Sequence, residues 1–211
     1  MKIRGCNMQI IPIFGTHLGV AKLESLDIGK ALTHVNTLKT YTKPGHAHNT
    51  ETIRLLHDSF FSSVKHECEK LSKEYINALG HELDRIKITS SWGNELRKGD
   101  PVNVHNHPNS FISGVFYLTD GSPLNFHNPL SHEDLFTFRT KVLHDDENPH
   151  TWQILKIPIN PGYLILFPSK IMHHVEENEN DYRYSVAFNT LPLVEYEHGL
   201  GNEMNINTII Q

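Results

Sequence analysis

Three histidines in the second half of the sequence have the spacing of metal ligands. His105 and His107 form a His-x-His pair where an expected strand, residues 102–105, runs into a turn. Alternate residues of a strand point to one face, so both imidazoles can converge on one point in the mouth of a barrel. His173, which follows a distant strand, supplies a third imidazole, whereas an extended chain would point His174 to the opposite face. The spacing therefore predicts a three-histidine metal site with open positions for substrates.

An arginine after the third histidine is the next residue with a chemical role. Arg183 opens an otherwise apolar strand, expected over residues 182–190. A guanidinium is costly to bury unless it meets a carboxylate, which its planar fork binds with two hydrogen bonds. The partner is either the carboxylate of a ligand or a structural carboxylate of the protein, and the residues alone leave both open.

A longer ordered pattern surrounds these four side chains. Its members are Trp92, Asn94, Gly99, His105, His107, Pro108, Ser110, Ser113, Gly114, Val115, Tyr117, Leu118, Phe167, Pro168, Ser169, His173, Val175, Arg183, Ser185, Ala187, Phe188 and Asn189. This pattern resembles the 2-oxoglutarate and iron(II)-dependent oxygenases, and within them an uncharacterised branch, often found in phage and marine bacteria, that is similar to prolyl 4-hydroxylase-like enzymes. The resemblance covers roughly residues 90–190 and extends more weakly to the N-terminal strand and helix.

The resemblance implies a double-stranded β-helix, or jelly roll, in which a His-x-Asp/Glu…His triad holds Fe(II). His105 and His173 fall at the two histidine positions of that triad. Arg183 matches the arginine that binds the distal carboxylate of 2-oxoglutarate, and Tyr117 matches the tyrosine whose hydroxyl assists it. Ser113 shares a face with Tyr117 by period two, and it either adds a hydrogen bond to the co-substrate or has only a structural role.

The sequence departs from the family pattern at one ligand position, where His107 replaces the usual carboxylate. Three neutral imidazoles leave bound Fe(II) with a charge of about +2 rather than +1, which changes metal affinity and the electronics of the oxidised metal. Halogenases of this superfamily have a small residue at the position, and a histidine is too large to leave space for a halide. In a second interpretation His107 stays beside the metal and water takes the ligand position.

The function implied by the resemblance is that of an oxidoreductase. With Fe(II), 2-oxoglutarate and O2, it would hydroxylate an unknown prime substrate and release succinate and carbon dioxide. The similarity to prolyl hydroxylases in ligand spacing favours a peptide or protein side chain over a small metabolite as that substrate.

Two other classes of function fit parts of the same pattern. Cupins share the jelly roll, and the intervals from Gly99 to His107 and from Gly162 to His173 match their two motifs. A cupin-like dioxygenase would bind iron through three histidines without 2-oxoglutarate. However, the glutamate that cupins place after the second histidine is missing, and Arg183 would have no role. The third class is a non-catalytic jelly-roll binding module.

Several other polar residues are interpreted as structural. His46 and His48 lie in an expected Pro/Gly-containing loop, where a solvated setting is favoured over a metal site. Trp92 and Asn94 are interpreted as packing and turn residues and not as substrate contacts. Residues 125–150 are expected to form a solvated loop and hairpin near the barrel mouth, where they could act as a substrate lid.

Short strands are expected to position these side chains. Apolar residues recur every three or four positions over residues 58–79, which predicts an amphipathic helix that ends at Gly80. Many short strands separated by Gly/Pro turns indicate an antiparallel barrel or double-sheet jelly roll, so the predicted fold class is mainly β with flanking helices. The expected strands cover residues 8–14, 18–24, 85–91, 102–105, 111–119, 124–127, 152–159, 163–167 and 182–190.

A single domain is expected over residues 1–211, with 1–85 as an N-terminal strand and helix support and 86–195 as the jelly-roll core. The length of 211 residues and the content of 38% hydrophobic and 20% charged residues are typical of one globular domain. The helix over residues 58–79 either braces the barrel or forms a homodimer face.

Composition also excludes several classes of partner. The net charge is −5 and no dense run of Lys and Arg is present, so no nucleic acid is expected as a partner. No apolar run approaches the roughly 18 residues of a membrane span, so no membrane association is expected. Cys6 and Cys68 lie far apart and form no CxxC motif, which favours a reducing compartment. The expected location is cytoplasmic, or the host cytoplasm if a phage encodes the protein.

Overall fold

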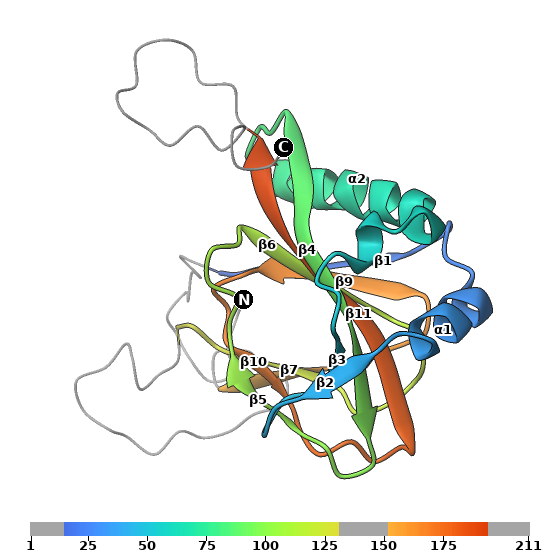
Figure 1. Ribbon diagram of the computed structural model, residues 1–211. Helices are drawn as coiled ribbons and strands as arrows, with labels where there is room; N and C mark the ends of the chain where they lie inside the picture. Colours follow the sequence, from blue (N-terminus) through green and yellow to red (C-terminus); the bar gives the residue numbers. More distant parts are fainter. Residues whose placement is uncertain (1–14, 131–151, 194–211) are drawn as a thin grey trace, which may run out of the picture.

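The strands of the protein form two antiparallel sheets that face each other across a barrel interior (Figure 1). The computed structural model describes residues 15–130 and 152–193. The larger sheet has the strand order β1-β9-β6-β11-β4-β3-β2, and the smaller sheet has the order β5-β10-β7-β8. The strands are β1 Gly19–Lys22, β2 Thr40–Thr42, β3 His48–Thr50, β4 Arg85–Arg97, β5 Val102–His105, β6 Ile112–Tyr117, β7 Leu124–His127, β8 Ile154–Ile157, β9 Tyr163–Pro168, β10 His173–Val175 and β11 Tyr182–Leu193.

The predicted fold class, a mainly β jelly roll with flanking helices, is confirmed by this arrangement. The strands at the centre of the larger sheet, β6, β11 and β4, come from the segment expected to form the core. The N-terminal strands β1, β2 and β3 join the same sheet. The N-terminal third of the chain therefore contributes strands to the barrel as well as the helices that support it.

Two helices cover the outer face of the larger sheet (Figure 1). Helix α1 is Ile28–Asn36, and helix α2 is Ser62–Ala78. The predicted stop of the second helix is confirmed, because Gly80 has a φ of +88°, the left-handed conformation that ends many helices. A short 3-10 turn, Ser59–Phe61, replaces its predicted first residues, and a second such turn, Leu55–His57, precedes them.

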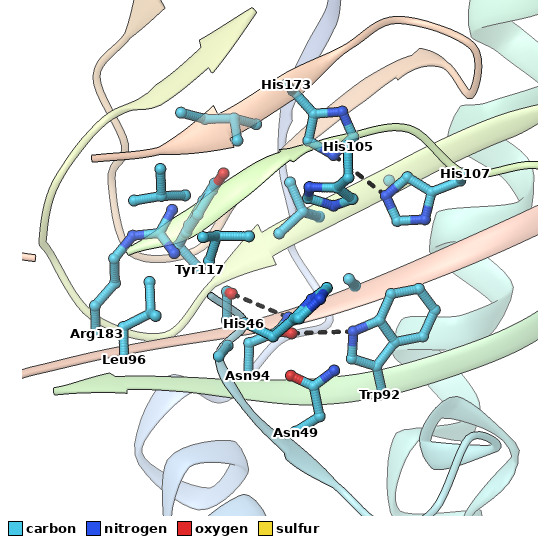
Figure 2. A pocket seen from close by; sticks show the side chains of 18 of the residues that line it. His46, Asn49, Trp92, Asn94, Leu96, His105, His107, Tyr117, His173 and Arg183 are labelled. Atoms are coloured by element: carbon cyan, nitrogen blue, oxygen red, sulfur yellow. Dashed lines mark hydrogen bonds between the residues drawn. The ribbon is translucent and has the colours of Figure 1, made fainter. Parts of the chain in front are cut away.

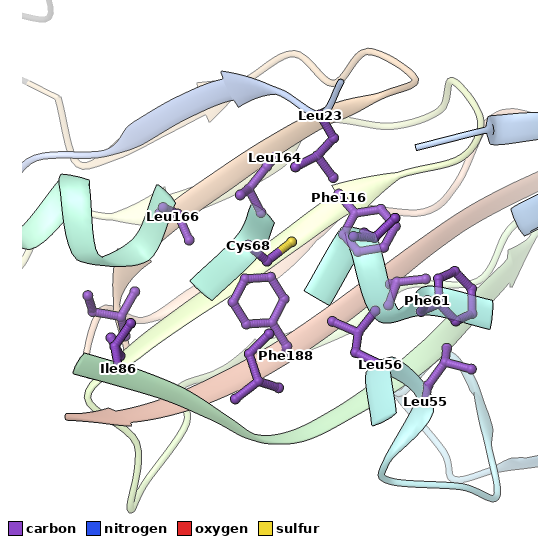
Figure 3. Close-up of a cluster of buried hydrophobic side chains, with 14 of the residues drawn as sticks. Leu23, Leu55, Leu56, Phe61, Cys68, Ile86, Phe116, Leu164, Leu166 and Phe188 are labelled. Carbon is purple, nitrogen blue, oxygen red and sulfur yellow. The ribbon is translucent and has the colours of Figure 1, made fainter. Parts of the chain in front are cut away.

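The core between the helices and the larger sheet is apolar. Cys68 of α2 lies in this cluster among phenylalanine and leucine side chains, close to Phe188 (Figure 3). Burial raises the pKa of the Cys68 thiol, so this residue is part of the core and not a reactive nucleophile. All six residues of β6 are buried, because helices cover one face of the sheet and the smaller sheet covers the other.

The structure differs from the expectations at four places. Residues 42–49, expected to form a loop, belong to the β2–β3 hairpin. Strand β4 continues to Arg97 through Trp92 and Asn94, which were interpreted as packing and turn residues. Pairing with β11 along the whole of β4 stabilises this extended conformation against local turn preference. Helix α1 and the three-residue strand β10 were not predicted.

Some expectations lie outside the described residues. These are the strand over 8–14, most of the polar stretch 125–150 and the end of the chain. Within residues 15–130 and 152–193, no helix is both long and apolar enough to cross a membrane.

The close contact between Gly114 and Phe188 yields a test of the core. A Cβ at Gly114 would lie 2.2 Å from the Phe188 ring, which is fully buried. Gly114→Ala is therefore expected to lower the free energy of unfolding by about 1–3 kcal/mol through overpacking, measured by urea denaturation. Gly29→Ala is the matched control, because a Cβ there meets its nearest atom at 3.7 Å and alanine favours the helix. Equal stability of Gly114→Ala and the natural protein would contradict this account.

Candidate active site

Pairing between two short strands of the smaller sheet brings two of the predicted metal ligands together. His105 at the end of β5 and His173 at the start of β10 are direct cross-strand partners. Their ring centroids lie 4.3 Å apart. Residues paired across an antiparallel ladder have adjacent side chains, so the register itself places the two imidazoles on one side of the sheet.

Backbone carbonyls orient both of these imidazoles. The Nδ1 atom of His105 is 2.8 Å from the Asn103 oxygen, and Nδ1 of His173 is 2.8 Å from the Ile171 oxygen. A carbonyl oxygen only accepts, so each Nδ1 carries the proton and each Nε2 presents its lone pair. A carbonyl bound to the distal nitrogen is the usual arrangement behind a metal-ligating histidine.

His107 completes the group, although it is held in a different way. Its Nε2 lies 3.2 Å from Nε2 of His173, and its backbone N–H donates to the Ser169 carbonyl at 2.9 Å. The Trp92 indole stacks over its ring with centroids 5.8 Å apart (Figure 2). No carbonyl among the described residues binds its Nδ1, so the tautomer of His107 is not fixed as it is in the other two.

The three histidines fit a transition-metal ion. Their ligand atoms all lie within 4.8 Å of one another. The 3.2 Å between the His107 and His173 nitrogens is close to the roughly 3 Å expected between neighbouring ligands with metal–nitrogen bonds of about 2.1 Å. Burial lowers the pKa of His107 to about 4 and that of His173 to about 3, and it also lowers the pKa of His105. All three imidazoles are therefore neutral at neutral pH and can donate lone pairs.

A cavity of about 260 Å³ opens from the three histidines into the barrel. Strands β4, β6 and β11 of the larger sheet form much of its wall, and Arg183 and Tyr117 lie at one end of it (Figure 2). Apolar side chains also line the cavity, among them Leu96, Val102, Val115, Leu124 and Val175.

Arg183 is a buried cation without a carboxylate partner. Only 3% of the residue is exposed, and its Nε donates to the Ser122 carbonyl at 3.1 Å. No salt bridge joins it to an acidic residue in the described part of the chain. Burial lowers the pKa of Arg183, but a guanidinium stays charged at neutral pH. Because a buried unpaired charge is costly, this arrangement fits a ligand that brings its own carboxylate.

Tyr117 adds a second donor at the same end of the cavity. The Arg183 guanidinium carbon lies 5.1 Å from the centre of its ring, and its hydroxyl is buried without a hydrogen bond to any described residue. Burial raises the pKa of Tyr117 to about 12, against the opposing effect of the Arg183 charge. The hydroxyl is therefore protonated and free to donate to a bound carboxylate.

Ser113, the third predicted co-substrate contact, is not brought to this cavity. Its hydroxyl is hydrogen-bonded to Ser169 at 2.8 Å and to the Asn189 carboxamide oxygen at 2.9 Å. The Asn189 amide in turn donates to Ser90. These polar groups satisfy one another at the far end of β6, which is the structural alternative considered for Ser113.

Other residues that line the cavity were not predicted as site residues. His46 lies in the loop of the β2–β3 hairpin, and Asn49 lies in β3. Trp92 and Asn94, assigned to packing from the sequence, also face the cavity. The alternation of Trp92 and Asn94 along one strand was an available signal, as was the His46-x-His48 spacing in the hairpin, whereas nothing marked Asn49. His48 turns away and binds Thr42 and Asp100.

Comparison with known proteins agrees with this geometry. Residues 90–189, which contain the three histidines and Arg183, match the family described as "Putative 2OG-Fe(II) oxygenase". The segment that carries the site therefore matches the 2-oxoglutarate and iron(II)-dependent oxygenases. The match indicates an oxidoreductase that uses Fe(II), 2-oxoglutarate and O2, as predicted. No curated relative matches the chain.

Solved structures of the superfamily share the fold at low sequence identity. A viral collagen prolyl hydroxylase from Paramecium Bursaria Chlorella virus-1, in complex with 2-oxoglutarate, is 11% identical with a TM-score of 0.55, covering 83% of this chain and 96% of that one. HygX from Streptomyces hygroscopicus, with nickel, 2-oxoglutarate and hygromycin B bound, is 15% identical with a TM-score of 0.57, covering 84% and 83%. A Pseudomonas putida prolyl-4-hydroxylase is 13% identical with a TM-score of 0.55, covering 82% and 92%.

The unequal support of the three imidazoles predicts unequal contributions to metal binding. His105→Ala and His173→Ala each remove a ligand whose tautomer a carbonyl fixes, and we expect each to lower Fe(II) affinity by more than about 100-fold. His107→Ala is expected to lower it only about tenfold. Anaerobic calorimetric titration measures these affinities, with His174→Ala as the control because His174 faces away and contacts His127. Equal losses in the three variants would contradict the argument.

Proposed function

We propose that this oxygenase uses 2-oxoglutarate and O2 to hydroxylate an organic prime substrate at a metal held by His105, His107 and His173. The observation that carries the proposal is the buried, unpaired Arg183 in the same cavity as the three histidines. A metal ion requires only the imidazoles, and a dicarboxylic co-substrate requires a cation at a fixed distance from them. The cavity provides both.

The residues of the chain would position the co-substrate as follows. Arg183 and Tyr117 hold the distal carboxylate, one through its charge and the other through its hydroxyl proton. The apolar side chains that line the cavity enclose the carbon chain and exclude water. Bound Fe(II) supplies the redox chemistry by which 2-oxoglutarate, O2 and a substrate C–H bond give succinate, carbon dioxide and an alcohol.

A peptide or protein side chain is the proposed prime substrate, in preference to a small metabolite. The resemblance in ligand spacing supports this choice, and two of the structural neighbours are prolyl hydroxylases by name. The cupin-like alternative without 2-oxoglutarate leaves Arg183 and the Tyr117 hydroxyl without partners, so the structure favours the oxygenase.

Spectroscopy of the metal centre tests the proposal most directly. Anaerobic addition of Fe(II) and then 2-oxoglutarate is expected to produce the weak visible metal-to-ligand charge-transfer band of a chelated 2-oxo acid. His173→Ala should abolish the band. Iron binding without a band and without affinity for 2-oxoglutarate would instead support the cupin-like dioxygenase. Binding of neither would support a non-catalytic module.

The role of Arg183 is tested separately. Arg183→Ala is expected to weaken 2-oxoglutarate binding about 100-fold or more while Fe(II) affinity is unchanged, because the distal carboxylate then lies in an apolar slot without a counter-charge. Arg97→Ala is the matched control, since it removes a surface guanidinium paired with Glu95 at 2.8 Å. Equal co-substrate affinity in the natural protein and Arg183→Ala would refute the assignment.

A further inference from the structure

A row of polar side chains crosses the inner face of the larger sheet. Asn49 of β3 is paired with Asn94 of β4, Asn94 with Ser185 of β11, and Ser185 with Tyr117 of β6. All four residues line the cavity. The row therefore crosses four neighbouring strands, from β6 at the Arg183 end of the cavity to β3.

The middle of this row is satisfied internally. The Asn94 amide donates to the Ser185 hydroxyl at 3.4 Å, and its carbonyl oxygen accepts from the Trp92 indole at 3.0 Å. These contacts are visible in Figure 2, where Trp92 extends from Asn94 towards His107. The side-chain oxygens of Asn94 and Ser185 and the Asn94 amide nitrogen thus each have at least one hydrogen-bond partner.

Both ends of the row carry buried polar atoms without partners. At one end is the Tyr117 hydroxyl, which the proposed function assigns to the distal carboxylate of 2-oxoglutarate. At the other end is Asn49, a half-buried residue whose side-chain carbonyl oxygen is buried and has no hydrogen-bond partner among the described residues. A buried carbonyl oxygen without a partner costs roughly 1–3 kcal/mol, so it is expected to meet a ligand.

The co-substrate cannot be that ligand. Its two ends are assigned to Arg183 and to the imidazoles, and its four C–C bonds span at most roughly 6 Å. Asn49 lies two strands away from β11, about 10 Å across the sheet from the strand that carries Arg183. Because no residue in the described part of the chain partners this oxygen, a second molecule in the cavity is the candidate partner.

We infer that Asn49 binds the prime substrate, and that the group it binds is a neutral amide, as in a peptide bond or a carboxamide side chain. This inference rests on the proposed function. The Asn49 subsite, formed by Asn49, His46 and Trp92, adjoins the metal ligands because the Trp92 indole stacks over the His107 ring. A substrate amide held at Asn49 therefore places neighbouring carbon atoms beside the three histidines.

The chemistry of the subsite selects an amide over a charged group. A carboxamide with both atoms available offers one acceptor and a donor, which matches the donor and acceptor of another amide. Among the described residues that line the cavity, Arg183 is the only Lys, Arg, Asp or Glu. No other charged side chain of this lining is thus available beside Asn49 to pair with an ionised group of the prime substrate, and burying such a group unpaired would be costly.

The test uses the protein loaded with Fe(II) and 2-oxoglutarate under anaerobic conditions, after its affinity for both has been measured. The probes are three matched derivatives of one carboxylic acid that contains no other amide, and they end in a methylamide, a methyl ester or a free carboxylate. Ligand-detected NMR gives their dissociation constants. The methylamide is expected to bind roughly fivefold to tenfold more tightly than the ester, which lacks the N–H donor. The carboxylate is expected to bind no better than the ester.

Variants locate this preference at Asn49. Asn49→Leu keeps the size of the side chain but removes both polar atoms, and Asn49→Ala is a second variant in case leucine does not fit. Each is expected to bind methylamide and ester equally while Fe(II) and 2-oxoglutarate affinities stay unchanged. Thr40→Ala is the control, because Thr40 lies in the same hairpin with its side chain exposed. It should keep the preference for the amide.

The possible failures are distinguishable. If the natural protein does not bind 2-oxoglutarate, the proposed function fails and the inference fails with it. If 2-oxoglutarate binds but the methylamide does not bind, or binds no better than the ester, only the inference is overturned. A preference for the amide that persists in Asn49→Leu or Asn49→Ala also overturns it.

Discussion

The register between β5 and β10 is the constraint on which the site depends. It pairs His105 with His173, and the carbonyls of Asn103 and Ile171 then fix which nitrogen of each ring is free. A slip of one residue would turn the side chains of a strand to the opposite face and replace His173 by His174. Such short strands specify register weakly by themselves. Pairing of β10 with β7 on its other side adds a second restraint on the same residues.

The second constraint is the buried positive charge of Arg183, which no carboxylate in the described part of the chain neutralises. Arg183 is accommodated through the Ser122 carbonyl, the face of Tyr117 and the absence of a Cβ at Gly121, where an added Cβ would lie 2.8 Å from its side chain. These contacts orient the guanidinium but do not neutralise it. The stability that this costs is offset by the apolar core between the helices and the other face of the sheet.

The sequence alone predicted those site residues that lie within a short motif or a recognisable strand. His105 and His107 share a segment, and Arg183 and Tyr117 begin and end recognisable apolar strands, so pattern and resemblance predicted the fold class and these residues. Asn49 could not be found in this way. The β2–β3 hairpin is polar and rich in turn residues, and it becomes sheet through pairing with β4, far along the chain. Ser113 shows a different kind of error, because it was predicted to contact the co-substrate and does not line the cavity. The alternation of side chains along a strand shows which face a residue lies on but not how far along the strand it is.

The balance of charge explains how a site without a protein carboxylate can hold both cofactors. The three imidazoles are neutral, because burial lowers their pKa values, and they leave the charge of a divalent cation intact. Together with Arg183, that cation presents about three positive charges to dianionic 2-oxoglutarate, one more than in a site where a carboxylate binds the metal. With the three histidines as the metal ligands, metal and co-substrate would therefore attract each other more strongly than in a carboxylate-containing site, and because binding coupling is reciprocal, each would raise the affinity of the site for the other. A metal held by neutral ligands would then be retained most firmly with 2-oxoglutarate bound.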